Sequence, residues 1–171
     1  MADINDAEKE FVIKRTFDAP RELVWKVWTE KEHLMKWFGP KGVTIPVCNM
    51  DFRVGGTFHY AMETPDGNRM WGKWVFREIQ PPEKLVLVNS FSDEKGNITR
   101  HPLAPTWPRE MLSTTTLQEA SGKTDLTITW LPINAGGDEI ATFEGGRDSM
   151  TGGWAGTFEQ LESYLASIQG E

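Results

Sequence analysis

The C-terminal segment from Asp138 to Ile168 constrains the fold most, because its helical pattern cannot be stable alone. Apolar residues recur on one face at helical spacing: Phe143, Met150, Trp154, Phe158, Leu161 and Leu165. The same segment contains Gly145, Gly146, Gly152, Gly153 and Gly156. Each interior glycine costs a helix about 1 kcal/mol relative to alanine. We therefore expect a long helix that tertiary packing holds in place, or that is kinked or broken at its glycines.

The layer that supports this helix is predicted to be a sheet. From Val43 to Leu131 the chain alternates between apolar, strand-like stretches and short turn sequences such as Pro65-Asp66-Gly67-Asn68. Strands are expected over Val43 to Val54, Thr57 to Thr64, Met70 to Ile79, Leu85 to Val88, Glu110 to Glu119 and Thr124 to Leu131. Short turns between successive strands indicate an antiparallel meander.

Before the meander, the sequence predicts one strand and two short helices. The strand covers Phe11 to Phe17, and Asp18 is expected to cap the helix that follows, with Pro20 in its first turn. The second helix is expected from Glu30 to Trp37. The stretch from Ser92 to Pro108 contains three prolines and is too long for a tight hairpin, so it is either a lid or a mobile loop.

This element order predicts an α+β protein with the helix-grip arrangement, in which a curved antiparallel sheet wraps a long C-terminal helix. No composition break marks a linker, and no repeat or low-complexity tract interrupts the chain. We expect a polar leader over residues 1–10, one domain over residues 11–168 and a short tail over residues 169–171.

Several short motifs, in this order, resemble one family. They are Phe17-Asp18-Ala19-Pro20 with Val24-Trp25, Trp37-Phe38-Gly39-Pro40, the run from Asp51 to Phe58, Gly72 before Trp74, the run from Ile79 to Leu85, and Gly153-Trp154 followed by Leu161 and Tyr164-Leu165. The chain is similar to homologues of the activator of heat-shock protein 90 ATPase (AHSA-like), in the START-like or SRPBCC superfamily. The resemblance covers about Phe11 to Ile168 and implies the helix-grip (START-like, Bet v 1-like) fold.

The superfamily also contains polyketide cyclases and plant hormone-binding proteins, so the resemblance allows several functions. In the eukaryotic activators, this domain is the C-terminal half of a larger protein whose N-terminal half binds the chaperone. No segment of this sequence resembles that half. Contact with a chaperone, as a stress-related interaction module, is therefore an alternative to ligand binding.

Charge and composition exclude several classes of partner. A net charge of −7 disfavours binding to nucleic acid or to an anionic membrane surface. No apolar run approaches the ~20 residues of a membrane span, and the polar N-terminus does not match a signal peptide, so a cytoplasmic location is expected. Cys48 is the only cysteine, which rules out an intrachain disulfide and a cysteine-based zinc site.

The sequence contains no recognisable catalytic motif. Nucleophile-elbow, P-loop, dinucleotide-binding and His-Glu-x-x-His signatures are all missing, and no pair of histidines has metal-ligand spacing on one element. We expect no cofactor and no metal, and an enzyme is the less favoured class. The weak catalytic candidates are His101, in the proline-rich loop, and Asp51, which could equally form a surface pair with Arg53.

A curved sheet under a helix leaves a cavity unless side chains fill it, and apolar cavities are the default binding sites of proteins. We expect the sheet side to be lined by Phe58, Tyr60, Met62, Trp74, Phe76, Met111, Ile128 and Trp130. The helix side would be lined by Met150, Trp154 and Phe158, and the mouth by Phe38 and Trp107. The alternative is that these rings pack together and leave no space.

The favoured function is binding of a small apolar ligand, lipid-like or aromatic, as a carrier or sensor. The alternatives are the chaperone-contacting module and a polyketide cyclase- or hydrolase-like enzyme. Eight tryptophans in a chain of 171 residues also suggest a homodimer, if some of those rings lie exposed on loops.

Overall fold

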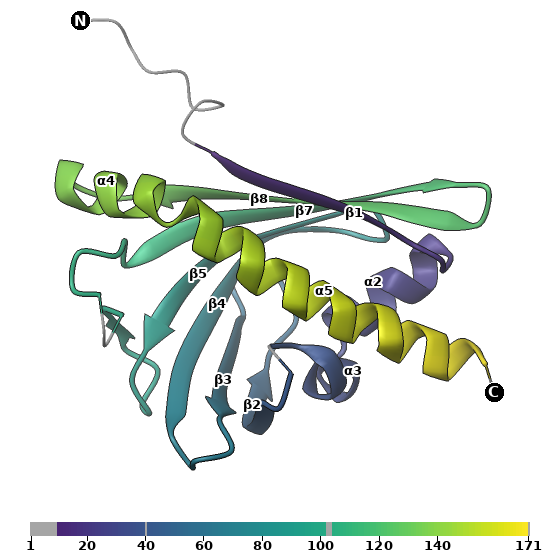
Figure 1. The fold of residues 1–171 in the computed structure, drawn as a ribbon, viewed down its shortest axis with the longest axis horizontal. Coiled ribbons are helices and arrows are strands. Elements are labelled where there is room, and N and C mark those ends of the chain that lie inside the picture. The colour runs from purple at the N-terminus through teal and green to yellow at the C-terminus, as the bar shows by residue number, and fades with distance from the viewer. Residues whose placement is uncertain (1–9, 40, 102–103, 171) are drawn as a thin grey trace, which may run out of the picture.

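The computed structural model describes residues 10–39, 41–101 and 104–170. Figure 1 shows one curved sheet with a long helix lying across it. The elements in order are β1 (Phe11–Phe17), α2 (Arg21–Thr29), α3 (Lys31–Trp37), β2 (Thr44–Met50), β3 (Thr57–Glu63), β4 (Arg69–Gln80), β5 (Lys84–Ser92), β6 (Ile98–Thr99), β7 (Glu110–Ala120), β8 (Lys123–Ile133), α4 (Gly137–Gly145) and α5 (Arg147–Gln169).

All strand pairs in the described residues are antiparallel, in the order β1-β8-β7-β5-β4-β3-β2, with the two-residue strand β6 beside β5. The first strand therefore closes one edge of the sheet beside the last strand. Helix α5 runs across the inner face, and α2 and α3 cover one end of it (Figure 1). This is the helix-grip fold, as the sequence predicts.

The C-terminal helical segment is broken once, between α4 and α5, and the break is at Gly146. A Cβ atom there would lie 2.8 Å from Cζ3 of Trp107, closer than carbon atoms can pack. Glycine at this junction therefore lets the Trp107 ring lie directly against the backbone. The prediction of a helix broken at glycine is confirmed, although four of its five glycines lie within helices.

Two local predictions are wrong. Asp18 does not cap the first helix, because the N-cap is Pro20, which makes no side-chain cap bond. The chain is still extended at Pro20, and the carbonyl of buried Ala19 accepts a hydrogen bond from the Thr124 hydroxyl. The strand expected from Val43 to Val54 ends at Met50. The remainder forms a turn in which the backbone N–H of Arg53 bonds the carbonyl of Asp51.

Strand β5 is longer than predicted and continues into a hairpin inside the stretch from Ser92 to Pro108. The carboxylate of Asp93 accepts the backbone N–H groups of Lys95 and Asn97, each at 2.9 Å, which fixes the turn that leads to β6. The Asn97 side-chain amide also donates to this carboxylate at 3.0 Å, and this bond, together with the backbone bonds, lowers the pKa of Asp93 below its ordinary value. Side-chain capping of a turn thus orders part of a stretch that was expected to be irregular.

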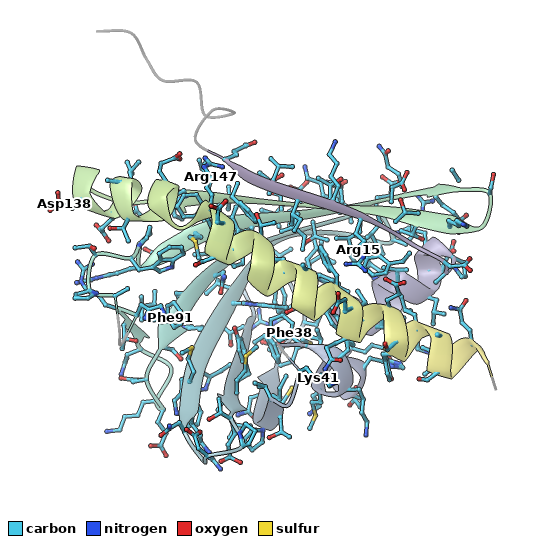
Figure 2. The ribbon with its side chains drawn as sticks, in the orientation of Figure 1. Arg15, Phe38, Lys41, Phe91, Asp138 and Arg147 are labelled. Atoms are coloured by element: carbon cyan, nitrogen blue, oxygen red, sulfur yellow. The ribbon has the colours of Figure 1, made fainter. Side chains whose placement is uncertain are left out.

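Polar contacts hold α5 to its neighbours at several points. Arg15 of β1 forms an ion pair with Glu162 at 2.7 Å (Figure 2). The Tyr164 hydroxyl bonds Nδ1 of His33 on α3 at 2.6 Å. The His33 side chain is partly buried, with 23% of its surface exposed. Among the described residues, no helix has the length and apolar character needed to cross a membrane.

Candidate functional site

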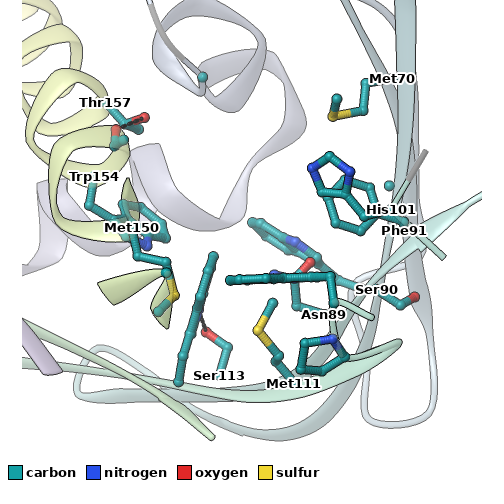
Figure 3. Close-up of a pocket in the computed structure, with 18 of the residues that line it drawn as sticks. Met70, Asn89, Ser90, Phe91, His101, Met111, Ser113, Met150, Trp154 and Thr157 are labelled. Atoms are coloured by element: carbon teal, nitrogen blue, oxygen red, sulfur yellow. Dashed lines mark hydrogen bonds between the residues drawn. The ribbon is translucent and has the colours of Figure 1, made fainter. Parts of the chain in front are cut away.

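A pocket of about 570 Å³ lies between the inner face of the sheet and the N-terminal half of α5. Strands β3, β4, β5, β7 and β8 supply one wall, and α4 and α5 supply the other. The end of α3 and the loop before β7 complete the rim. In Figure 3, Met150, Trp154 and Thr157 of the helix lie on one side, and Met111, Asn89 and Phe91 of the strands lie on the other.

The structure places nine of the thirteen predicted site residues around this pocket: Phe38, Tyr60, Met62, Trp74, Trp107, Met111, Trp130, Met150 and Trp154. They come from seven different segments of the chain, so the fold brings together rings that are far apart in sequence. Figure 2 shows Phe38 below α5, and Phe38 directly follows the end of α3.

The other four predicted residues, Phe58, Phe76, Ile128 and Phe158, lie in the packed core and do not line the pocket. Each is at most 1% exposed. Phe158 packs edge-on against Phe17 with ring centroids 5.6 Å apart. Period-two and helical spacing identify the correct face for these residues. They do not show how far along that face the packing is solid.

The β4 strand explains how large rings fit on this wall. Tyr60 of β3 pairs with Gly72 of β4, and a Cβ atom at position 72 would overlap the Tyr60 hydroxyl. The ring of Tyr60 therefore lies over the bare backbone of Gly72. Trp71 faces the other side of the strand, where its ring stacks on His59 with centroids 5.1 Å apart. The pairing of β4 with β5 shifts register only beyond this region, at a β-bulge between Phe76 and Glu78. Trp74 and Phe76 can thus share the inner face.

The rim along the helix consists of small residues. Gly145, Ser149 and Gly153 recur every four residues, line the pocket and are exposed. A Cβ atom added at Gly145 or Gly153 would meet no other atom within 4 Å. Helix α5 therefore does not need glycine at position 153 to approach the sheet. The absence of a side chain at Gly153 instead leaves open space beside the pocket.

Sequence reasoning missed the polar residues of the pocket wall. Asn89, Ser113, Thr115 and Thr157 line the pocket among the rings. Asn89 lies in the part of β5 that the predicted strand did not include. If the predicted strand had been extended by one residue, the alternation that places Leu85 and Leu87 on the inner face would have placed Asn89 there too.

The two catalytic candidates occupy different places. Asp51 forms an exposed ion pair with Arg53 at 2.7 Å in the turn after β2, and it does not line the pocket. His101 does line the pocket, next to Phe91 with ring centroids 4.7 Å apart. Burial lowers the pKa of His101. A base acting on a bound molecule has geometric support only at His101.

Ionisable groups in the pocket are held uncharged. The described lining residues include no Asp, Glu, Lys or Arg. Burial raises the pKa of the Tyr60 hydroxyl far above its ordinary value, and the hydrogen bond with Trp74 opposes this only in part. Elsewhere in the described residues, no group of three His, Cys, Asp or Glu side chains is placed to hold a metal.

The family model described as "Activator of Hsp90 ATPase homolog 1-like protein" matches residues 18–166. The chain belongs to this family. No protein with a curated description matches the chain significantly. The matched range agrees with the span of the sequence motifs that resemble this family, which run from Phe17 to Leu165.

Solved structures share the fold over almost the whole chain. A protein from Nitrosomonas europaea is 29% identical, with a TM-score of 0.75, and the match covers 98% of this chain and 100% of that one. A protein from Arthrobacter aurescens is 26% identical, with a TM-score of 0.77 and coverage of 96% and 90%. The AHSA1 protein from Silicibacter pomeroyi, 17% identical with a TM-score of 0.70 and coverage of 93% and 99%, supports the fold alone.

Proposed function

We propose that this member of the Activator of Hsp90 ATPase homolog 1-like family binds one small apolar molecule in its pocket, as a carrier or a sensor. The observation that carries the proposal is the aromatic, uncharged pocket of about 570 Å³ under the glycine-rich half of α5. Ligand pockets of proteins fall in the range of about 300–1,000 Å³ and are lined mainly by apolar and aromatic side chains. The size and the lining of this pocket both fit that description.

The shape of the rim supports reversible entry. The small residues Gly145, Ser149 and Gly153 border the pocket along α5, and partly exposed Met62 and more exposed Met70 border it on the β3–β4 side. Methionine side chains are flexible and adapt to ligands of different shape. We also propose a cytoplasmic location, as the sequence predicts.

Two neighbouring glycines provide a matched test. Gly153 lines the pocket and Gly152 does not, yet both are exposed residues of α5 whose Cβ positions have open space around them. We expect Gly153→Leu to weaken binding of the neutral apolar dye Nile red at least about tenfold, because its side chain would occupy the rim of the pocket. Gly152→Leu should bind the dye as the unmodified protein does.

Fluorescence titration of the dye, with circular dichroism to verify folding, measures both effects. Equal affinities for the two variants would contradict binding in this pocket. Absence of dye binding to the unmodified protein, repeated with a library of neutral apolar compounds, would contradict the function itself.

Contact with a chaperone is the second candidate, and family membership is what favours it. The test is a pull-down of the purified protein with the Hsp90-type chaperone of the same organism, with and without a pocket ligand. A stable complex that does not depend on the ligand would support the interaction module. A homodimer stays a prediction, since three of the eight tryptophans are buried and the other five are partly exposed.

A further inference from the structure

The strand wall of the pocket contains one amide side chain in an otherwise apolar row. In the register of the sheet, Asn89 of β5 lies between Trp74 of β4 and Met111 of β7. Along its own strand it alternates with Leu87 and Phe91, and all three line the pocket. Figure 3 shows Asn89 beside Met111 on the strand side, facing Met150 and Trp154 across the pocket.

The Asn89 amide has no hydrogen-bond partner among the described residues, although its flanking strand positions are buried. An amide carries two N–H donors and one carbonyl acceptor. Leaving such a group unsatisfied in an apolar site costs roughly 1–3 kcal/mol unless water or a ligand supplies the partner. Asn89 is thus a polar group that faces the pocket space and that the protein itself leaves unsatisfied.

One hydroxyl of the same wall is set up as a donor. Nε1 of Trp130 donates to Oγ of Ser113 at 3.1 Å. An indole N–H can only donate, so the Ser113 oxygen is used as an acceptor and its own proton is left to donate. Nε1 of Trp154 is also unpaired, but neighbouring atoms bury it fully, so a ligand does not reach it.

The pocket therefore offers hydrogen-bond donors without a carboxylate, ammonium or guanidinium group. The side chains of Asn89, Ser113 and Tyr60 are among those that carry N–H or O–H groups, and the described lining residues include no Asp, Glu, Lys or Arg. Burying an unpaired ligand charge in such an environment is very costly, whereas an uncharged oxygen acceptor would satisfy a donor that is otherwise unpaired.

We infer that the ligand is an uncharged molecule with an apolar body and a carbonyl-type oxygen, and that this oxygen accepts a hydrogen bond from the Asn89 side-chain amide. The inference rests on the proposed function, since it names the chemical class that the same pocket takes. Asn89 is a specificity residue in this account, because it selects for the oxygen and contributes little to the binding of the apolar body.

Three probes of similar shape separate the contributions of the apolar body, the carbonyl oxygen and a negative charge to binding. The first, 2-acetonaphthone, has a ketone; 2-ethylnaphthalene has a methylene group in its place; and 2-naphthoate has a charged carboxylate. Equilibrium dialysis with ultraviolet detection measures the affinity of each for the unmodified protein, for Asn89→Leu and for Asn49→Leu. Asn49 is an exposed strand residue of β2 outside the pocket, so it controls for the same chemical change.

We expect the unmodified protein and Asn49→Leu to bind the ketone about tenfold more tightly than the hydrocarbon, and 2-naphthoate at least about a hundredfold more weakly than the ketone. In Asn89→Leu the preference for the ketone should disappear, while 2-ethylnaphthalene binds equally well or better.

Equal affinity of the unmodified protein for ketone and hydrocarbon would overturn the inference and leave the proposed function standing. A ketone preference that persists in Asn89→Leu, or tight binding of 2-naphthoate, would overturn it as well. If neither neutral probe binds the unmodified protein, the proposed function and this inference both fail.

Discussion

The two halves of helix α5 lie over the same sheet but pack against it differently. In the C-terminal half, Phe158, Leu161 and Leu165 are at most 2% exposed and fill the space between the sheet and helices α2 and α3. In the N-terminal half, Met150, Gly153 and Trp154 line the pocket, and Gly153 has no side chain to fill the space beside it. One helix therefore both closes the core and borders a cavity.

Trp154 marks the boundary between the halves. It stacks on Trp28 at 6.1 Å and packs against Phe158 at 5.3 Å on the core side. It also meets Trp130 edge-on at 5.5 Å and lines the pocket. A wall of rings packed on one another stays rigid without being filled from the other side, which allows a cavity to persist next to a well-packed core.

The largest expected difference between the halves is in stability. Phe158→Ala should lower the free energy of unfolding by about 3–5 kcal/mol, because it leaves a void in solid packing. Met150→Ala in the pocket half should cost about 2 kcal/mol, since Met150 already borders open space. Urea unfolding of both variants measures this difference. Equal losses would break the distinction between a packed half and a hollow half.

The next effect concerns the sheet wall of the hollow half. Gly72→Ala should destabilise the protein by about 1–3 kcal/mol, because its Cβ atom would overlap the Tyr60 ring. In a Tyr60→Ala background the same change should cost much less, and a double-mutant cycle isolates that coupling. Additive effects of the two substitutions would show that the clash does not explain the glycine.

Two glycines of the C-terminal segment should respond in opposite directions. Gly152→Ala should raise the free energy of unfolding by about 0.5–1 kcal/mol, because the new methyl group meets nothing and the helix gains propensity. Gly146→Ala should lower it, because the methyl group would press on Trp107. Thermal unfolding of the pair is the measurement, and a gain in stability for Gly146→Ala would contradict the packing described at the break.

The smallest effect is the pH dependence at the rim. Burial lowers the pKa of His101 below 6.5, so the unfolded chain takes up a proton first as the pH falls. The contribution of neutral, buried His101 to the free energy of unfolding is therefore fully present above pH 6.5 and is lost as the pH falls through its lowered pKa. The unmodified protein should therefore lose slightly more stability than His101→Gln between pH 7.5 and about pH 5, measured by urea unfolding. If stability changed with pH equally in the two proteins, His101 would not be the source of the pH dependence.

Much of the fold follows from the sequence, because turn residues and apolar periodicity act locally. The turn of Pro65 to Asn68 and the glycines around position 146 locate a hairpin and a helix break without any knowledge of long-range contacts. The predictions for the end of β2 and for the cap of α2 were wrong. The backbone turn at Asp51 and the burial of Ala19, which decide these two features, depend on other parts of the chain.

The pocket was predicted less completely, for a physical reason. Periodicity shows that Phe58 and Phe158 face inward. Only the curvature of the sheet determines that these two rings lie in the packed core, whereas Met62 and Met150 border open space. Asn89 was missed because a polar residue after an apolar run has the appearance of a strand end. Its role depends on neighbours from β4 and β7.

The most direct test of the central claim is native mass spectrometry of the protein purified from its own host, followed by organic extraction and identification of any bound molecule. We predict one equivalent of an uncharged apolar molecule on the unmodified protein and on Gly152→Leu, with much lower occupancy on Gly153→Leu. A protein that is empty in repeated preparations, or that carries the same molecule equally in all three forms, would contradict a ligand held in the pocket beneath the glycine-rich half of α5.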